Sequence, residues 1–140
     1  MGLLEGKDAK KRKSHFRNLV VLSMVDGVIR ESELRFLLVL GRLLKLSEKE
    51  IKSVLKNPDK IKFTPPTDSK ERFSQLFDLI ALMMIDRHVD RREMDFCMTI
   101  ASGLGFRPTV VQELVTKIVK AITESVPKEK LSIEMTSFLD

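Results

Sequence analysis

The sequence predicts an all-α fold of about seven helices, in which two three-helix units pack as one bundle. The first observation is compositional: the 140 residues include no Trp and no Tyr, whereas Leu, Met, Lys and Glu, which favour helices, are abundant. The second is that apolar residues recur at helical spacing rather than in strict alternation. The third is an internal repeat, in which matching residues return sixty positions later without a gap.

The repeat contains core apolar residues and two carboxylates. Core packing explains why apolar positions recur, but it does not explain why an Asp returns at one helix end and a Glu at the start of the next helix. The carboxylates are therefore the first place to look for function. The matching residues are Leu19, Leu22, Met24, Asp26, Glu33, Phe36 and Leu44 in the first copy, and Leu79, Leu82, Met84, Asp86, Glu93, Phe96 and Leu104 in the second.

The first copy, residues 10–57, has recognisable helix boundaries. A helix over 10–25 is apolar nearly all round from Leu19 onward, which is typical of a central helix, and Gly27 should end it. A second helix is expected over 31–45. A third should begin at Ser47, which forms a capping box with Glu50 three residues later.

The second copy repeats this plan after a connector with three prolines, residues 58–67. Thr67 or Asp68 should cap its first helix, Asp90 with Glu93 forms a D-x-x-E cap for its second, and Pro108 suits the first turn of its third. The expected helices are 68–85, 91–104, 108–124 and a C-terminal helix within 127–140, and copy two spans 68–124. Since neither copy is large enough to bury its apolar faces alone, we expect one domain over residues 1–140.

The composition argues against an enzyme and favours a cytoplasmic protein. The sequence has no Gly-rich phosphate loop and no Cys/His or Ser/His arrangement of the catalytic kind. His15 is expected to be solvated, and Cys97 to be a small buried hydrophobic residue. We expect no transmembrane segment, because the longest apolar run, residues 79–85, is far too short to cross a bilayer, and no signal-peptide pattern opens the sequence.

The positive charge concentrates near the start of the sequence. The net charge is +5, and six basic and two acidic residues place +4 of it within the first seventeen positions. We favour a solvated, partly helical leader, because the run is short and has no interleaved aromatic or Gly residues. Nucleic acid is thus an unlikely partner, and an interface with it would depend on a basic arm: Lys7, Lys10, Lys11, Arg12 and Lys13.

The repeated turns place Asp26 and Asp86 at helix C-termini, where the helix dipole disfavours negative charge. One compensation is local: the Asp accepts backbone N–H bonds from the following turn, while Glu33 and Glu93 occupy favourable first-turn positions. The other is a divalent cation, since such ions prefer several carboxylate oxygens. The spacing is not that of an EF-hand. The candidate ligand sets are Asp26, Glu31 and Glu33, and Asp86, Asp90 and Glu93.

A mixed nitrogen and oxygen site is a further alternative in the second turn. Asp86, His88 and Asp90 alternate there, which suits zinc or manganese. The pattern is weak, because Arg87, Arg91 and Arg92 can pair with the same carboxylates.

The turn Met24-Val25-Asp26-Gly27-Val28-Ile29, followed by Glu33, resembles the tellurite-resistance TerB family and its relatives, which include the N-terminal domain of DjlA-type co-chaperones. The resemblance implies an internally duplicated all-α fold, a role in stress-related multiprotein assemblies, and a cluster of acidic residues that binds a divalent metal. Because the ligands are carboxylates, we expect calcium or magnesium rather than zinc. Carried onto this sequence, the metal residues are Asp26, Glu33, Asp86 and Glu93, with Asp90 nearby. Arg87 stands where the motif has Gly.

These observations favour a non-enzymatic, TerB-like interaction module that binds a protein partner and is linked to stress response, with a divalent metal at the repeated acidic turn. Two alternatives stay open. The first is a structural or protein-interaction domain without metal. The second is a weak nucleic-acid binder that uses the basic arm.

Overall fold

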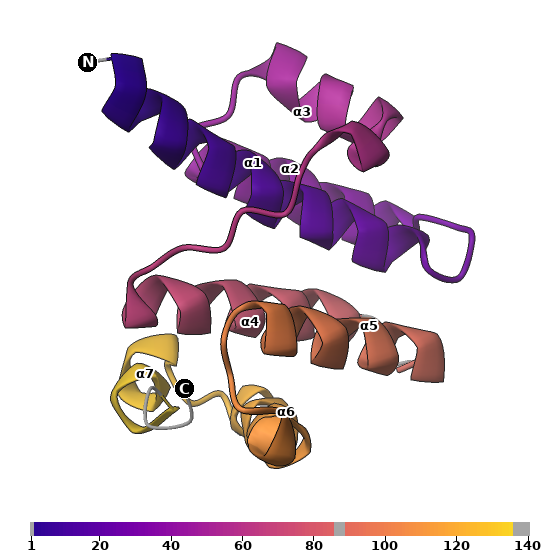
Figure 1. Cartoon of the computed structure of the whole chain (residues 1–140). Coiled ribbons are helices and arrows are strands. Elements are labelled where there is room, and N and C mark those ends of the chain that lie inside the picture. Colours follow the sequence, from indigo (N-terminus) through magenta and orange to yellow (C-terminus); the bar gives the residue numbers. More distant parts are fainter. Residues whose placement is uncertain (1, 86–88, 136–140) are drawn as a thin grey trace. The chain divides into compact units, whose positions relative to one another are not determined.

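The computed structural model describes residues 2–85 and 89–135, and these residues form seven α-helices, two short 3-10 helices and no strand (Figure 1). The predicted all-α fold is confirmed. The chain divides into two compact units, Met1–Pro65 and Pro66–Asp140, which we call unit 1 and unit 2. No helix in the described part is both long enough and apolar enough to cross a bilayer.

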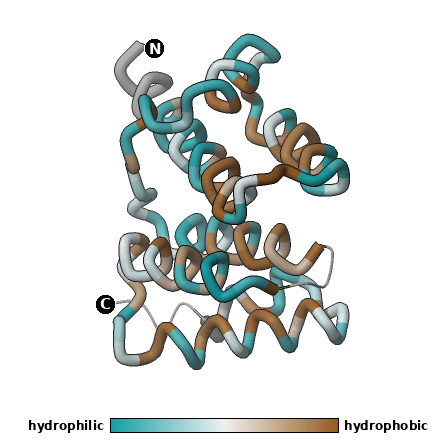
Figure 2. The backbone as a smooth tube through the Cα atoms, turned by 90° about the vertical axis from the view of Figure 1, so that its right-hand side faces the viewer, coloured by the Kyte–Doolittle hydropathy of each residue, from teal (hydrophilic) through white to brown (hydrophobic). Residues whose placement is uncertain are grey.

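Unit 1 is organised around its first helix, which contacts both other helices of the unit and the 3-10 helix η1. The elements are α1 (Gly2–Met24), α2 (Glu31–Leu43), α3 (Glu48–Lys56) and η1 (Pro58–Lys60). The central position predicted for this helix explains its apolar surface: Phe16, Leu19 and Val20 are fully buried. Figure 2 shows hydrophobic and hydrophilic stretches recurring along the helices.

Unit 2 is organised around α4 (Ser69–Met83), which contacts the other three helices of the unit. These are α5 (Arg91–Gly103), α6 (Val111–Thr123) and α7 (Lys128–Met135). Phe73, Leu76 and Leu79 of α4 are fully buried. The helix α7 returns to pack on α4 and α6, where Lys128 lies 3.0 Å from the Asp78 carboxylate. The last residues of the expected C-terminal helix, 136–140, lie outside the described residues.

The helices α3, α4 and α5 each begin directly after a cap residue that the sequence predicts. The Ser47 hydroxyl accepts the Glu50 N–H, and the Glu50 carboxylate accepts the Ser47 N–H. Asp68 caps α4, and Asp90 caps α5. Gly27 follows α1 with a φ of +90°, a conformation that costs glycine little and other residues much more.

Two boundaries differ from the predictions by more than two residues. The helix α1 begins at Gly2 rather than near Lys10, because no proline interrupts residues 2–10 and Gly6 alone does not end the helix. Pro108 opens a 3-10 helix, η2 (Pro108–Val110), and α6 starts only at Val111. The duplication of a whole three-helix unit stays a prediction.

Candidate functional site

The first acidic turn is closed by its own residues. The Asp26 carboxylate accepts the Val28 N–H at 3.2 Å and lies 3.0 Å from the Arg30 guanidinium. Glu33 reaches back to accept the Arg30 N–H at 2.9 Å, and its carboxylate lies 3.7 Å from the same guanidinium. Both side chains are withdrawn from solvent, since Asp26 is 15% and Glu33 only 4% exposed. The local N–H bond predicted for Asp26 is confirmed.

Arg30 therefore supplies the positive charge that Asp26 needs at the end of a helix. One guanidinium serves two carboxylates, which lowers the cost of burying Glu33. Glu31 is not brought to this point, because it is exposed and pairs with Arg35 one helical turn along.

The second acidic turn shares the bond from a backbone N–H to a buried Glu at the start of α5, but its arginine pairs with a different residue. Asp90 accepts the Arg92 N–H at 2.7 Å and pairs with the Arg92 guanidinium at 3.0 Å. Glu93, which is 4% exposed, accepts the Asp90 N–H at 3.1 Å, so the pair forms a capping box. The predicted ligand Asp86, its neighbour Arg87 and His88 of the mixed site lie outside the described residues.

The donor set of the first turn fits a divalent cation poorly. Calcium and magnesium take about six or more oxygen ligands. Here two carboxylates already face one guanidinium, which an incoming cation would have to displace. Within the described part of the chain, no three His, Cys, Asp or Glu side chains gather as a group that could hold a metal ion.

Cys97 is buried, as predicted, and its thiol lies 3.9 Å from the Met83 sulfur. Burial, with a smaller contribution from the Glu93 charge, raises the pKa of the thiol to about 12. The thiolate that nucleophilic chemistry requires is therefore scarce at neutral pH.

The prediction that the His15 side chain is solvated is wrong. It is 2% exposed rather than solvated, because the buried part of α1 already begins at Ser14, one residue earlier.

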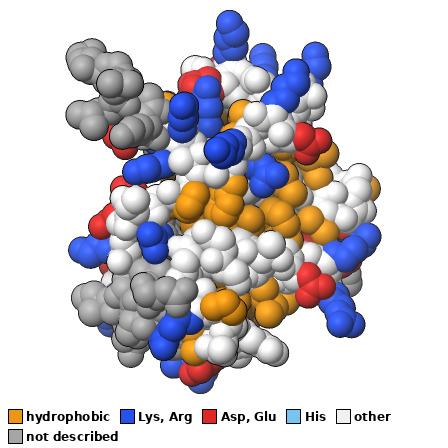
Figure 3. All heavy atoms as spheres, viewed as in Figure 1, with side chains coloured by type: hydrophobic (Ala, Val, Ile, Leu, Met, Phe, Trp, Pro, Cys, Tyr) orange, Lys and Arg blue, Asp and Glu red, His pale blue; other side chains and the backbone are white. Residues whose placement is uncertain are grey.

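The basic arm is not simply a solvated face. Lys10 and Lys13 of α1 lie at the edge of a cleft of about 610 Å³ in unit 1. Lys11 and Arg12 are partly exposed, and the side chain of Lys7 lies outside the described residues. On the face seen in Figure 3, Lys and Arg side chains gather over unit 1. We call the cleft of about 610 Å³ the lysine cleft. Its lining residues are Lys10, Lys13, Lys60, Ile61, Lys62, Phe63, Thr64 and Pro65.

The segment 60–65 was missed as a functional element because it belongs to the expected connector. Its signal was present in the alternation of Lys60 and Lys62 with Ile61 and Phe63. The segment is held against α1 by a bond in which the Thr64 N–H donates to the Ser14 hydroxyl at 2.7 Å. This contact joins residues fifty positions apart and cannot be inferred from local pattern.

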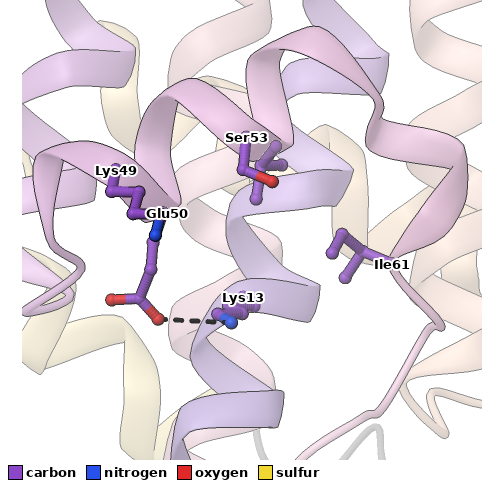
Figure 4. A pocket seen from close by; sticks show the side chains of 6 residues that line it. Lys13, Lys49, Glu50, Ser53 and Ile61 are labelled. Carbon is purple, nitrogen blue, oxygen red and sulfur yellow. Dashed lines mark ion pairs between the residues drawn. The ribbon is translucent and has the colours of Figure 1, made fainter.

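A smaller cavity of about 200 Å³ adjoins the lysine cleft, with which it shares Lys13 and Ile61. Figure 4 shows Lys13 of α1 and Glu50 of α3 pointing toward one another across it, 3.3 Å apart. The Ser47 N–H, and to a smaller extent Lys13, lowers the pKa of Glu50 against the opposing effect of burial. Glu50 thus joins the cap of α3 to α1.

No protein-family model, curated protein or solved structure matches this chain. The resemblance to the TerB family stays a prediction that depends on the turn residues quoted above.

Proposed function

We propose that this chain is a non-enzymatic helical interaction module, in which the acidic turns are structural joints that need no metal. The observation that carries the proposal is the burial of Glu33 and Glu93, each of which accepts the N–H of the residue that precedes its helix. A buried carboxylate with a fixed backbone donor holds the angle at which the chain enters a helix.

The joints matter because the entry angle of α2 or α5 decides which of its faces meets the preceding helix. In the first turn, Arg30 adds a charge-assisted contact to both Asp26 and Glu33. In the second turn, Arg92 makes a charge-assisted contact with Asp90. Carboxylates used in this way keep a partner-binding surface rigid, which lowers the entropy cost of binding.

A metal-loaded module is the second candidate, and the convergence of Asp26 and Glu33 on one point is what favours it. A cation that replaced Arg30 would find two carboxylates already near each other. The TerB resemblance implies a divalent metal at this place, and the carboxylate ligands favour calcium or magnesium. The corresponding second set is Asp86, Asp90 and Glu93.

The two candidates differ in their response to cations. The purified protein is titrated with Ca²⁺, Mg²⁺, Mn²⁺ and Zn²⁺ while its amide NMR spectrum is followed, in parallel with Glu33→Ala and the double variant Asp26→Asn/Asp86→Asn. We expect no saturable change around residues 24–33. Glu33→Ala should lose roughly 1–2 kcal/mol of unfolding free energy, equally with EDTA and with each cation, because the partly buried N–H of Arg30 loses its acceptor.

Glu31→Ala is the matched control, since it removes an exposed first-turn carboxylate from the same helix. It should leave stability unchanged, because exposed ion pairs contribute little. Saturable shifts at both turns that disappear in the double Asp variant, together with stabilisation by the same cation, would overturn the metal-free proposal in favour of the metal-loaded module.

A further inference from the structure

Three of the four lysines that line the lysine cleft make no ion pair in the described part of unit 1. Lys13 pairs with Glu50, whereas the described part of unit 1 places no carboxylate within ion-pair distance of Lys10, Lys60 or Lys62. Among the residues that the structure describes, no Asp or Glu lines the cleft. Positive side chains that line one cleft repel each other, and the walls of the cleft concentrate their electrostatic field. The lysine cleft should therefore attract an anionic group.

The same cleft has an apolar side, which a simple anion would not use. Ile61 and Phe63 are half-buried, and Pro65 extends the apolar surface along the segment. The backbone at Ile61 is extended, with φ −97° and ψ 121°, and the bond from the Thr64 N–H to Ser14 fixes the far end of the segment. The cleft thus presents lysines and apolar side chains in a held, extended arrangement.

We propose that the lysine cleft binds an acidic, extended segment of a protein partner, with an apolar side chain of that segment on Ile61 and Phe63. Carboxylates of the segment pair with Lys10, Lys60 and Lys62. The inference rests on the proposed interaction function, but it does not depend on whether the acidic turns hold metal.

The lining favours a peptide over a nucleic acid. Proteins that hold single strands stack successive bases on aromatic side chains and add Arg for stacking and phosphate contacts. The described lining of the cleft includes one aromatic residue, the half-buried Phe63, and no Arg. Its volume of about 610 Å³ suits a short segment anchored by one or two side chains rather than a long polyanion.

The test is an amide NMR titration of the full chain with a synthetic six-residue peptide in which glutamates alternate with leucines. Saturable shifts are expected at residues 10–13 and 60–65, and they should weaken as salt is raised. Lys60→Ala/Lys62→Ala should weaken binding roughly three- to tenfold, because two exposed charge contacts are lost. Lys52→Ala/Lys56→Ala, which removes two exposed lysines of α3 that do not line the cleft, should bind as the unaltered protein does.

Two altered peptides separate the parts of the proposal. A peptide with Gln in place of Glu tests the charge, and one with Ala in place of Leu tests the apolar contact, and each should bind more weakly. No saturable shift, equal binding of the Gln peptide, or equal weakening by the two lysine pairs would overturn the proposal. Tighter binding of a deoxythymidine oligonucleotide at the same residues would also overturn it and assign the cleft to nucleic acid. The cation titration tests the proposed function separately, so the two can fail independently.

Discussion

Gly41 shows how closely the helices of unit 1 approach one another. A Cβ atom at this position would lie 2.8 Å from Ile51 Cδ1 and 2.9 Å from Ile51 Cγ1, with Phe16 Cε1 at 3.3 Å. The two closest atoms belong to the Ile51 side chain, so a methyl group at residue 41 would force that side chain to shift. The space at this position is limited by packing and not by backbone conformation.

Gly41→Ala should therefore destabilise the protein by about 1–3 kcal/mol through overpacking, although alanine is the better helix former. The measurement is the free energy of unfolding from urea denaturation followed by circular dichroism.

Ile51→Ala provides the control for this prediction. Alone it should cost about 2–5 kcal/mol through the cavity it leaves. In the double variant the new methyl group of residue 41 enters that cavity, so the combined loss should be clearly smaller than the sum of the single losses. Strictly additive losses would contradict the packing argument.

The C-terminal ends of α2 and α5 close with the same backbone motif, sixty residues apart. The Leu46 N–H donates to the Gly41 carbonyl at 3.1 Å, and the Phe106 N–H donates to the Ala101 carbonyl at the same distance. This is the bond of a Schellman motif, which needs a left-handed residue just beyond the helix. That residue is Gly105 in α5, with φ +99°, but Lys45 in α2, with φ +62°.

Lys45→Gly should stabilise the protein by roughly 0.5–1 kcal/mol, because the left-handed conformation strains any residue with a Cβ and the flexibility of glycine offsets only part of that relief. Thermal unfolding provides the measurement. Lys45→Ala is the control, since it removes the charge and keeps the strain, and it should leave the melting temperature nearly unchanged. A Gly variant no more stable than the Ala variant would contradict this explanation.

The elements that sequence predicted correctly are those decided by a few neighbouring residues. Ser47 and Asp90 cap helices because a short polar side chain reaches an N–H three residues or fewer along the chain. The internal bonds of the first acidic turn belong to the same class, and so does the pairing of Arg92 with Asp90.

The lysine cleft was not predictable in this way. Lys10 and Lys62 are fifty-two positions apart, and only the packing of residues 60–65 on α1 places them in one lining. The basic arm is visible in the sequence as a run of positive charge, but residues 60–65, which pack beside it, have the pattern of a connector. The buried position of His15 was missed for a similar reason, since local pattern placed it next to a solvated arm.

At the scale of the whole molecule, the division into units of 65 and 75 residues raises the question of how far each unit is stable alone. Chains of this length bury only about 60% of the surface that their unfolded state exposes, so they are marginal. Unit 2 has the better prospect, because α4 is in contact with three other helices. In unit 1, the buried surface of α1 includes Ser14 and Asn18, which contribute little hydrophobic free energy.

We therefore expect the fragment 66–140 to keep a cooperative thermal transition below that of the full chain, and the fragment 1–65 to lose most of its helicity. An equimolar mixture should regain the native amide spectrum, because each three-helix copy is predicted to be too small to bury its apolar faces alone. A matched pair split inside α4, 1–76 and 77–140, should recover less, since it cuts a buried helix of unit 2. If 1–65 and 66–140 each give native spectra alone and ignore each other when mixed, the units are independent domains and the single-domain prediction is wrong.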